Sequence, residues 1–353
     1  MRDYDKLKIS YKLNIRSAVR SINEAGIGFA VIVDDDDLVI GILTDGDFRR
    51  AVLKGLDLNE SVLRITNREF QFVRPGFSDS DALHLLQSGK FAFLPVLDNN
   101  RLIGILSEHD LQYPDLSTPT KKKVDSHVVI MAGGKGTRLE PFTKILPKPL
   151  IPIGDKTMLE VIMDEYAKYG INDFHISVCH KAKMIKAYFE YIENGYNIHY
   201  INEENPLGTC GALKLIEGKF DTPFFVSNCD IIIKSDYSKI FDYHQSENFM
   251  FTIVTSMQQM IVPYGVCELN ASGGLSRINE KPKFDYLINT GMYVLNPEVL
   301  QFIPEGIYFD ITDLIKKLLD MNLKIGVYPV PEQSYVDVGQ WAEYKRAISI
   351  LTT

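Results

Sequence analysis

A glycine- and proline-rich stretch at residues 130–154 constrains the fold more than any other part of this chain. An apolar run at 128–132 leads into it and is typical of a buried parallel strand. The glycines that follow tolerate positive φ and let the backbone approach a bulky polar group. The glycines and the cations among them are Gly133, Gly134, Gly136, Lys135, Arg138, Lys144 and Lys148. A strand, a glycine loop and clustered cations together predict a polyphosphate site.

Two common phosphate loops are excluded. The stretch lacks the Gly-x4-Gly-Lys-Ser/Thr of a P-loop, and Leu139 stands where a dinucleotide fingerprint requires its third glycine. Four prolines prevent a helix from following directly, namely Pro141, Pro147, Pro149 and Pro152. We therefore expect an extended loop and long cationic side chains, rather than a helix dipole, to hold the phosphates. The alternative interpretation is a solvated basic surface loop.

The composition limits the partners and the location of the protein. A length of 353 residues predicts two or three domains, and a net charge of −8 with a pI near 5.5 argues against a nucleic-acid partner. The four cysteines are scattered without Cys-x2-Cys, which predicts reduced thiols. No apolar run approaches the ~18 residues that span a bilayer, and the first residues lack an apolar signal core. We therefore expect a cytoplasmic protein with no membrane partner.

The motif Gly-Gly-x-Gly-Thr-Arg-Leu-x-Pro-x-Thr-x3-Pro-Lys-Pro-Leu at 133–150 resembles the signature of the sugar-1-phosphate nucleotidyltransferases. The resemblance implies a nucleotidyltransferase domain over residues 127–353, whose glycine loop wraps a nucleoside triphosphate. It implies catalytic roles for Arg138 and Lys148, which would face the phosphates. The nucleotide contacts that it implies in this loop are Ala132, Gly133, Gly134, Gly136, Thr137 and Arg138.

Strand and helix patterns alternate after this loop. Helices are expected at 158–169 and 183–191, and strands at 174–179, 198–201 and 224–227. This alternation predicts an α/β fold with a mostly parallel, Rossmann-like sheet, and the family resemblance makes it GT-A-like. Ligands should bind at the carboxyl ends of the strands.

The segment 206–213, Pro-Leu-Gly-Thr-Cys-Gly-Ala-Leu, resembles the base-binding loop of the family, with Cys210 in place of Ala. The resemblance implies nucleotide contacts from Gly208 and Thr209, and places Glu203 where a side chain often reads the base. A carboxylate only accepts hydrogen bonds, which complements the adjacent N1–H and N2–H2 donors of guanine. Uracil and cytosine present acceptors there, so we favour GTP over UTP or dTTP. The alternative is that Glu203 is a solvated loop acid.

The sequence Asn228-Cys229-Asp230 follows an apolar strand and resembles the Asn-Gly-Asp of the family. A carboxylate at a strand end suits Mg²⁺. Asp337, in Tyr-Val-Asp-Val-Gly, resembles the second ligand in the family's Asp-x-Gly motif, although alone it would be interpreted as a turn residue. Glycosyltransferases of similar fold more often carry Asp-x-Asp, which is absent here. The resemblance therefore implies Mg²⁺ as cofactor, held by Asp230 and Asp337, with Asp230 also counted as catalytic.

Three later segments, 263–266, 280–282 and 288–295, resemble the sugar-phosphate pocket of the family. The residues that this resemblance assigns to the sugar phosphate are Gly265, Glu280, Lys281, Asn289 and Thr290. Met292 and Tyr293 are interpreted as core residues instead.

The first 120 residues contain an internal repeat, because residues 18–48 and 82–111 align once one residue is removed from an acidic turn. Each copy predicts a helix and a hairpin, and ends in Gly-x-x-Thr/Ser-x-x-Asp. These ends resemble a tandem CBS pair (a Bateman module), an α+β module with repeats at about 10–58 and 70–118 and a linker at 113–126. The resemblance implies an adenine-nucleotide site at Thr44, Asp47, Ser107 and Asp110. The alternative is that Asp47 and Asp110 only cap the helices that follow and that the module holds subunits together.

Together these features predict Mg²⁺-dependent transfer of a nucleotidyl group from an NTP to a hexose-1-phosphate, giving an NDP-sugar and pyrophosphate. CBS pairs fused to a short domain of this kind resemble guanylyltransferases of bacterial legionaminic acid synthesis, which implies glucosamine-1-phosphate. We also expect a homo-oligomer, in particular a dimer, and no acyl- or acetyltransferase domain after residue 353. The alternatives are the same reaction with UTP or dTTP and glucose-1-phosphate or another sugar phosphate, and a non-catalytic nucleotide-sensing protein.

Overall fold

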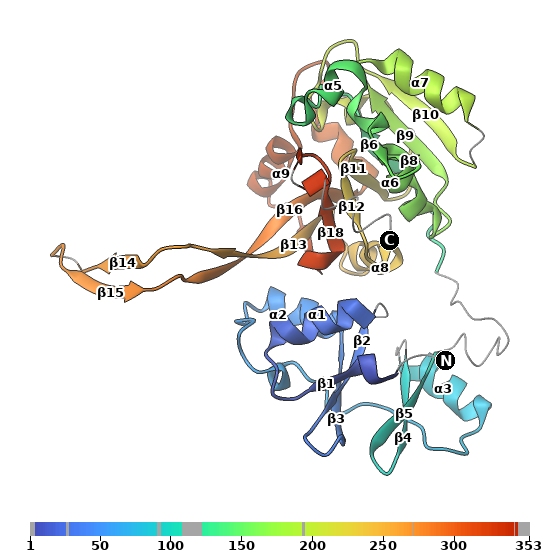
Figure 1. Ribbon diagram of the computed structural model, residues 1–353. Coiled ribbons are helices and arrows are strands. Elements are labelled where there is room, and N and C mark those ends of the chain that lie inside the picture. Colours follow the sequence, from blue (N-terminus) through green and yellow to red (C-terminus); the bar gives the residue numbers. More distant parts are fainter. Residues whose placement is uncertain are drawn as a thin grey trace. The chain divides into compact units, whose positions relative to one another are not determined.

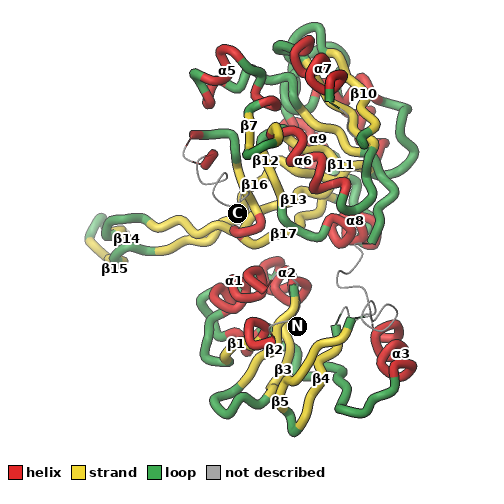
Figure 2. Tube along the Cα trace, turned by 45° about the vertical axis from the view of Figure 1, so that its right-hand side comes forward, coloured by secondary structure: helices red, strands yellow, loops and turns green. Residues whose placement is uncertain are grey.

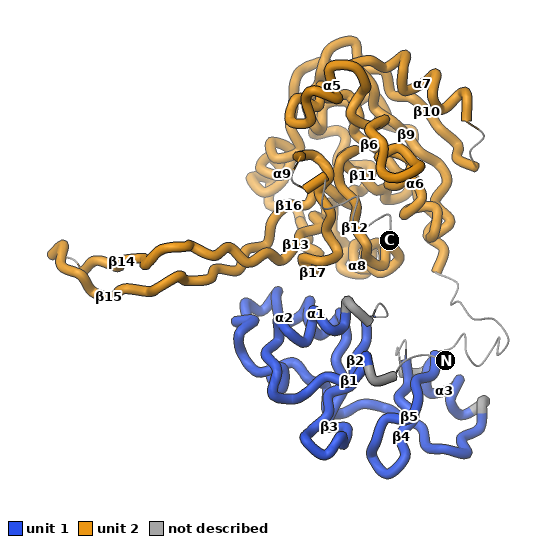
Figure 3. Tube along the Cα trace, viewed as in Figure 1, with its two compact units in different colours: residues 1–120 blue, residues 121–353 orange. Residues whose placement is uncertain are grey.

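The computed structural model of the chain divides into two compact units, residues 1–120 and 121–353, each described here by itself (Figures 1 and 3). The structure describes residues 4–25, 28–89, 93–107, 122–192, 195–270, 272–341 and 343–344. None of the helices in these ranges combines the length and the apolar character that crossing a bilayer requires.

Unit 1 is built from two hairpins, each preceded by a helix. Its elements are η1 (Tyr4–Leu7), β1 (Lys8–Ser10), α1 (Ile15–Ala25), β2 (Phe29–Val33), β3 (Val39–Thr44), α2 (Asp45–Leu53), η2 (Val62–Arg64), α3 (Asp79–Gly89), β4 (Leu94–Asp98) and β5 (Arg101–Leu106). The strand order is β1-β2-β3 in one sheet and β4-β5 in the other.

The two hairpins have the same irregularities at equivalent positions. The β2–β3 register shifts after Ile32, and the β4–β5 register shifts after Val96. Ile32 pairs in parallel with Ile9, as Val96 does with Val73. This shared register confirms the internal duplication that the sequence predicts.

Unit 2 contains a seven-stranded sheet with the order β10-β9-β6-β11-β16-β13-β17 (Figure 1). The elements of its first half are β6 (Val128–Met131), η3 (Thr137–Leu139), α5 (Phe142–Ile145), η4 (Lys148–Leu150), β7 (Pro152–Ile153), β8 (Lys156–Thr157), α6 (Met158–Ala167), β9 (Asp173–Val178), α7 (Ala182–Tyr191), β10 (Asn197–Asn202) and η5 (Gly211–Ile216). Those of the second half are β11 (Phe224–Asn228), β12 (Ile231–Ile233), α8 (Tyr237–Ser246), β13 (Phe251–Ile261), β14 (Val266–Leu269), β15 (Leu275–Asn279), β16 (Lys283–Leu295), η6 (Pro297–Phe302), α9 (Ile311–Asp320), β17 (Ile325–Pro331), η7 (Glu332–Ser334) and β18 (Tyr335–Asp337).

The sheet is mostly parallel, because β10, β9, β6 and β11 run the same way and only β16 of the seven runs opposite to its neighbours. Alternate residues of its strands face two separate cores. In β6, Val128 and Ile130 pack with α6, α7 and α8, whereas Val129 and Met131 pack with η5, η6 and α9. Helices therefore cover both faces, and the predicted α/β class with a parallel sheet is confirmed.

Strands β13 and β16 continue beyond the sheet as a ribbon that ends in the β14–β15 hairpin (Figures 1 and 2). Large apolar side chains on this ribbon are exposed, including those of Met260, Ile261, Tyr264, Leu269, Leu275, Ile278, Phe284, Tyr286 and Leu287. Exposed large apolar side chains that gather on one element are a common feature of binding surfaces.

A row of aromatic rings includes His175 on β9, His199 on β10, His127 just before β6 and Phe220 between η5 and β11. The His175 ring stacks on the His199 ring at 4.8 Å and meets the Phe220 ring edge-on at 4.8 Å. The His127 ring stacks on Phe220 at 4.5 Å. Burial, together with the neighbouring His199 and His127, lowers the pKa of His175 to about 4.

We expect the free energy of unfolding to fall as the pH drops from about 6.5 towards about 4. The first value is the ordinary pKa of a histidine, and the second is the pKa of His175 in the folded protein. In this range the unfolded chain binds a proton at residue 175 that the folded chain does not bind. The His175→Phe variant keeps a ring in the row but cannot titrate, so its stability should depend less on pH. Urea unfolding of both proteins over this range measures the difference. If the free energy of unfolding depended on pH equally in both proteins, groups other than His175 would cause the acid sensitivity.

Candidate active site

Four neighbouring parallel strands end at the same edge of the sheet in unit 2. Gly133 follows β6, Cys179 follows β9, Glu203 follows β10 and Asp230 follows β11. The chain moves from β6 outward to β9 and β10 and then returns to the other side of β6 as β11. Ligands of open α/β sheets bind at such a switch point, so these four residues mark the candidate site.

The glycine loop fits its neighbours so closely that larger residues are excluded at two positions. A Cβ on Gly133 would lie 2.4 Å from Glu203 Oε1. A Cβ on Gly136, whose φ is +68°, would lie 2.8 Å from Lys148 Cβ. Ala132 is buried, and its amide donates to the Ser177 carbonyl at 3.0 Å. The loop is therefore hydrogen-bonded to β9 and lies close to Glu203 and Lys148, while Gly134, Thr137 and Arg138 are open to solvent.

Only single turns of helix follow the glycine loop. Between residues 133 and 157 the structure has η3, α5 and η4, of which α5 spans four residues. The sequence predicted that no long helix would follow, and this is confirmed. A phosphate at this loop would therefore be bound by the loop amides and the cationic side chains, and not by the dipole of a long helix.

Two of the four clustered cations converge on one carboxylate. Lys148 is 8% exposed, and its ammonium donates to Asp230 Oδ2; Asp230 is 7% exposed. Arg138 reaches the same oxygen at 3.4 Å, and its side chain is 60% exposed. Lys144 instead pairs with Glu140 at the surface, at 3.7 Å. Lys148 and Arg138 therefore form the positive side of the site.

Asp230 and Asp337 converge on Gly339. The strands β12 and β18 pair antiparallel with Ile231 opposite Asp337, and the Val338 amide donates to the Asp230 carbonyl at 2.9 Å. A Cβ on Gly339 would lie 2.4 Å from Asp230 Oδ2 and 2.9 Å from Asp337 Oδ1. The Gly339 amide donates to Asp337 Oδ1 at 2.7 Å. The close pairing of these two acids comes from the strand register and from the missing side chain at Gly339.

The Asp230–Asp337 pair is a candidate ligand set for a divalent cation. Burial raises the pKa of Asp337, and the nearby Asp230 carboxylate raises it further, whereas the Gly339 amide and Lys148 lower it. Among the described residues, no group of three or more His, Cys, Asp or Glu side chains is arranged to hold a metal. In proteins Mg²⁺ is commonly bound by one or two carboxylates, with substrate phosphates and water completing the coordination.

Glu203 is buried and hydrogen-bonded, so it is not a solvated loop acid. It is 9% exposed. Its Oε1 accepts from the Ser177 hydroxyl, and its Oε2 accepts from the Leu207 amide at 2.9 Å. The carboxylate therefore links β9 to the start of the loop predicted to contact the base.

The loop that contains Gly208 and Thr209 is fixed against residues 307–311. A Cβ on Gly208, whose φ is +81°, would lie 2.7 Å from the Phe309 carbonyl oxygen. The Thr209 amide and hydroxyl donate to Asp310 Oδ1 at 3.0 and 3.1 Å. Asp310 also begins α9 in a capping box with Asp313. The loop continues directly into the 3₁₀ helix η5.

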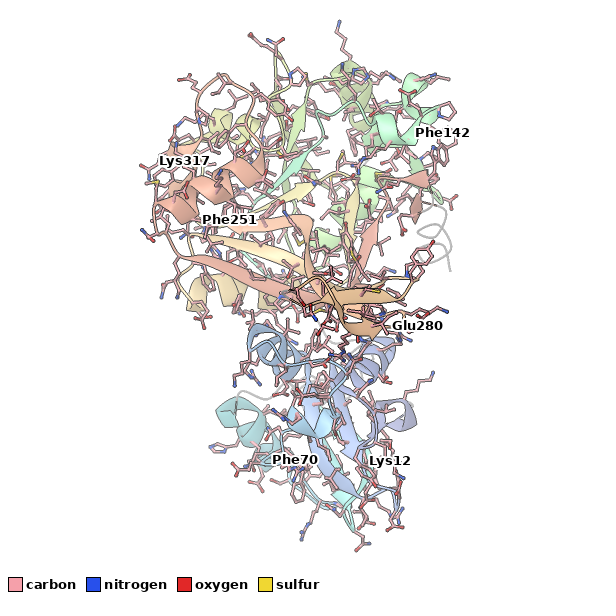
Figure 4. All side chains as sticks on the ribbon, turned by 90° about the vertical axis from the view of Figure 1, so that its left-hand side faces the viewer. Lys12, Phe70, Phe142, Phe251, Glu280 and Lys317 are labelled. Atoms are coloured by element: carbon pink, nitrogen blue, oxygen red, sulfur yellow. The ribbon has the colours of Figure 1, made fainter. Side chains whose placement is uncertain are left out.

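The residues assigned to the sugar phosphate lie in two places. Gly265, Glu280 and Lys281 are on the ribbon, where a Cβ on Gly265 would lie 2.9 Å from Glu280 Oε2. Figure 4 shows Glu280 on this ribbon, well separated from Phe142 beside the glycine loop. Asn289 donates to the Tyr293 hydroxyl at 2.9 Å, and Thr290, 2% exposed, donates to the Val254 carbonyl at 2.8 Å. The Thr290 hydroxyl thus supports the fold at β16.

In unit 1, Thr44 and Asp47 form a capping box at the start of α2. The Thr44 amide and hydroxyl donate to Asp47 Oδ2 at 2.9 and 2.7 Å, and Arg50 pairs with Asp47 Oδ1 at 2.5 Å. Ser107 is buried, and Asp110 lies outside the described residues. The capping role that the sequence offered for Asp47 is therefore present.

A family model described as nucleotidyl transferase matches residues 127–353, and a CBS domain model matches residues 2–54 and 62–113. The chain belongs to the nucleotidyl transferase family. Its first 113 residues carry the CBS pair that the repeat predicted.

Two curated relatives of this nucleotidyl transferase differ in the nucleotide that their names specify. A UTP–glucose-1-phosphate uridylyltransferase of Synechocystis sp. is 32% identical over 240 residues, 62% of each chain. A mannose-1-phosphate guanyltransferase of Yarrowia lipolytica is 38% identical over 184 residues, 50% of each chain. The chain thus spans 50 to 62% of the length of these relatives.

Solved structures share the same fold. The crystal structure of HddC from Yersinia pseudotuberculosis aligns with a TM-score of 0.51 at 25% identity, covering 64% of this chain and 99% of that chain. The complex of HddC with GMP-PN aligns with a TM-score of 0.50, with the same identity and coverage.

Two residues of the site were not predicted from the sequence. Lys181, whose φ is +54°, donates from Nζ to the Thr143 carbonyl at 2.7 Å, and so supports the loop after the glycines. The Trp341 indole donates to the Glu140 carbonyl at 2.7 Å, and its ring lies 4.9 Å from Phe142. Lys181 could have been found by its place just after β9, whereas no sequence motif indicates Trp341.

Proposed function

We propose that this protein transfers a nucleotidyl group from an NTP to a hexose-1-phosphate. The observation that carries the proposal is the convergence of Asp230 and Asp337 beside Lys148 and Arg138, at the carboxyl edge of a parallel sheet. The family membership supports the reaction class, and both curated relatives described above carry names of sugar-1-phosphate nucleotidyltransferases.

The proposed reaction requires no general base. A sugar phosphate has a second pKa of about 6 and is mostly a dianion at neutral pH. One of its oxygens attacks the α-phosphorus of the NTP, the bond from that phosphorus to the bridging oxygen breaks, and pyrophosphate leaves. Lys148 would hold a phosphate in line, and Arg138 would stabilise the charge that gathers on the leaving pyrophosphate.

The donor set fits Mg²⁺ as the cofactor. Asp230 and Asp337 would hold the ion, since both carboxylates lie close to Gly339. When bound, the ion would supply positive charge to phosphoryl oxygens. Lys148 and Arg138 already neutralise part of the charge of Asp230. The negative charges of the carboxylates and the phosphates would therefore be offset by these two cations and the metal ion.

We propose GTP as the preferred nucleotide, with Glu203 accepting from guanine N1–H and N2–H2. Its burial and its place beside Gly133 support this role, since the carboxylate touches the loop expected to hold the phosphates. The guanyltransferase relative and the HddC complex with GMP-PN also favour guanine. The uridylyltransferase relative supports the alternative, UTP.

For the second substrate we propose glucosamine-1-phosphate, as in legionaminic acid synthesis, with mannose-1-phosphate and glucose-1-phosphate as the alternatives named by the relatives. The ribbon residues Gly265, Glu280 and Lys281 would contact it. The contact between Gly265 and Glu280, and the left-handed backbone of Lys281 (φ +46°), support their acting as one unit.

The decisive experiment measures pyrophosphate release with Mg²⁺ for GTP, ATP, UTP, CTP and dTTP, each combined with a panel of hexose-1-phosphates. We expect the highest kcat/KM for GTP with glucosamine-1-phosphate. Release with UTP alone would overturn the guanine assignment and keep the reaction class. No release from any pair would overturn the enzyme and leave a nucleotide-sensing protein.

The Arg138→Ala variant should lower turnover about 100-fold, because it removes a preorganised charge from the departing pyrophosphate. The side chain is 60% exposed, so the free energy of unfolding should change by less than about 0.5 kcal/mol. Steady-state kinetics and urea unfolding measure the two quantities. Unchanged turnover would remove Arg138 from the chemistry.

We also propose that an adenine nucleotide binds the CBS pair and regulates the enzyme, with Thr44, Asp47, Ser107 and Asp110 as its contacts. The exposed Arg50, which pairs with Asp47, supports the proposal because it supplies positive charge beside the proposed ribose site. We further propose a homodimer in the cytoplasm. The four free cysteines are compatible with a reducing compartment, and light scattering would measure the oligomer.

The Asp47→Ala variant should abolish the rise in melting temperature that AMP or ATP produces in the wild type. It should also lower the free energy of unfolding by about 1 kcal/mol, since the capping box is lost. Asp57→Ala is the matched control, because Asp57 makes comparable local hydrogen bonds to Asn59 elsewhere in unit 1. A thermal shift that persists in Asp47→Ala would leave Asp47 as a helix cap only.

A further inference from the structure

We propose that Ser177 sets the base selectivity of this site by fixing the orientation of the Glu203 carboxylate. The proposal rests on the proposed function, in which Glu203 faces the base. Ser177 belongs to none of the motifs that mark the site, and it acts through Glu203, so it is a positioning residue.

Ser177 contacts two parts of the proposed nucleotide site, namely the start of the glycine loop and the Glu203 carboxylate. It is fully buried in β9, opposite Met131 of β6 and Ile201 of β10. Its carbonyl accepts from the amide of Ala132, the first residue after β6, at 3.0 Å. Its hydroxyl donates to Glu203 Oε1. One residue therefore fastens both the start of the phosphate loop and the carboxylate proposed to read the base.

The Glu203 carboxylate is held at both oxygens. Oε2 accepts from the Leu207 amide at 2.9 Å, while Oε1 accepts from Ser177 and lies where a Cβ of Gly133 would come within 2.4 Å. Rotating the carboxylate would break a hydrogen bond or press an oxygen against the glycine loop. Its plane is thus fixed before a nucleotide binds.

A fixed carboxylate discriminates between bases through its remaining acceptor positions. Each oxygen accepts one bond from the protein and keeps a further lone pair. Guanine offers two adjacent N–H donors, which a carboxylate of set orientation can accept together, whereas uracil offers an acceptor beside a single donor. Without the Ser177 hydroxyl, Oε1 turns more freely and the discrimination falls, because polar groups select a partner only when they are held in place.

The test measures two ratios in the wild type and in Ser177→Ala. The first is kcat/KM for GTP divided by kcat/KM for UTP. The second is kcat/KM for GTP divided by kcat/KM for ITP, which lacks the N2 amino group of guanine. Loss of one charge-assisted hydrogen bond should lower both ratios about tenfold. Ser177→Thr keeps the hydroxyl and should restore them. In a Glu203→Gln background, Ser177→Ala should leave the ratios within about twofold, because the two residues act through one contact.

Ser227→Ala is the matched control. Ser227 is also fully buried, on the adjacent parallel strand β11, but its hydroxyl donates to the Asn228 carbonyl at 3.0 Å. Removing it should leave both ratios within about twofold. If Ser177→Ala lowered kcat/KM for all nucleotides equally, Ser177 would be a purely structural residue and the proposal would be overturned.

Failure of this proposal and failure of the proposed function give different results. If the wild type preferred UTP, the guanine assignment would be wrong, and a shifted preference in Ser177→Ala would still support Ser177. If no turnover occurred, the same ratios would be taken from dissociation constants measured by calorimetry. If Ser177→Ala did not fold, Ser177→Cys, of similar size and a weaker donor, would replace it, and unchanged ratios there would overturn the proposal.

Discussion

Replacing Asp230 with Asn should lower turnover by at least about 1,000-fold, because the variant loses a charged ligand for the proposed metal ion at the reacting phosphates. The same change leaves the Lys148 ammonium buried beside a neutral amide. We therefore expect the free energy of unfolding to fall by about 1 to 3 kcal/mol. Pyrophosphate release at saturating substrates and urea unfolding measure the two effects.

The matched control is Asp242→Asn, which removes the carboxylate of a surface pair. Asp242 pairs with Lys122 at 2.7 Å, and both side chains are at least half exposed. Surface pairs of this kind contribute little, so turnover and stability should stay close to the wild-type values. If Asp230→Asn kept a tenth or more of wild-type turnover, Asp230 would not be a catalytic residue.

Gly339→Ala should lower turnover about 100-fold or more while the protein stays folded. The added methyl would lie 2.4 Å from Asp230 Oδ2 and 2.9 Å from Asp337 Oδ1, so the two carboxylates must move apart. Displacing catalytic groups by about 1 Å is enough for losses of this size. The concentration of Mg²⁺ at half-maximal activity should rise as well, and a titration of activity against Mg²⁺ measures it.

Gly195→Ala provides the control for this change, because a Cβ at Gly195 meets nothing within 4 Å. Its turnover and Mg²⁺ dependence should match the wild type. If Gly339→Ala changed neither quantity, the proximity of Asp230 and Asp337 would have no part in catalysis.

The sheet of unit 2 could be predicted because its signals are local. The apolar run at 128–132 forms β6, and the predicted strand at 224–227 forms β11, one residue longer. Periodicity also located α6, although the helix ends at Ala167 instead of Tyr169. The position of the site followed from a general property of parallel sheets and needed no contact to be known.

The contacts within the site could not be predicted in the same way. That Gly339 sits between Asp230 and Asp337 depends on the register of β12 against β18, which joins residues about a hundred positions apart. The pairing of Ser177 with Glu203 depends likewise on the register of β9 against β10. A sequence motif can identify one residue of such a contact, but its partner is known only once the strands are paired in the fold.

The ribbon was the least predictable part of the structure. The motifs at Gly265 and Glu280 resemble one pocket, and the structure indeed brings these two residues together. Their strands, however, extend away from the sheet and expose apolar residues such as Met260 and Ile278. An alternating pattern looks the same in a sheet and in a projecting ribbon, so the sequence cannot distinguish the two.

The packing of Trp341 has a practical consequence. It is the only tryptophan in the chain, and its indole is hydrogen-bonded to Glu140 and packed on Phe142, in the segment that follows the glycine loop. Emission from this one ring therefore originates beside the proposed phosphate site. The protein carries an intrinsic fluorophore there, so we expect nucleotide binding to change its emission. A titration of this emission would then follow nucleotide binding without a label, also in variants that have no turnover.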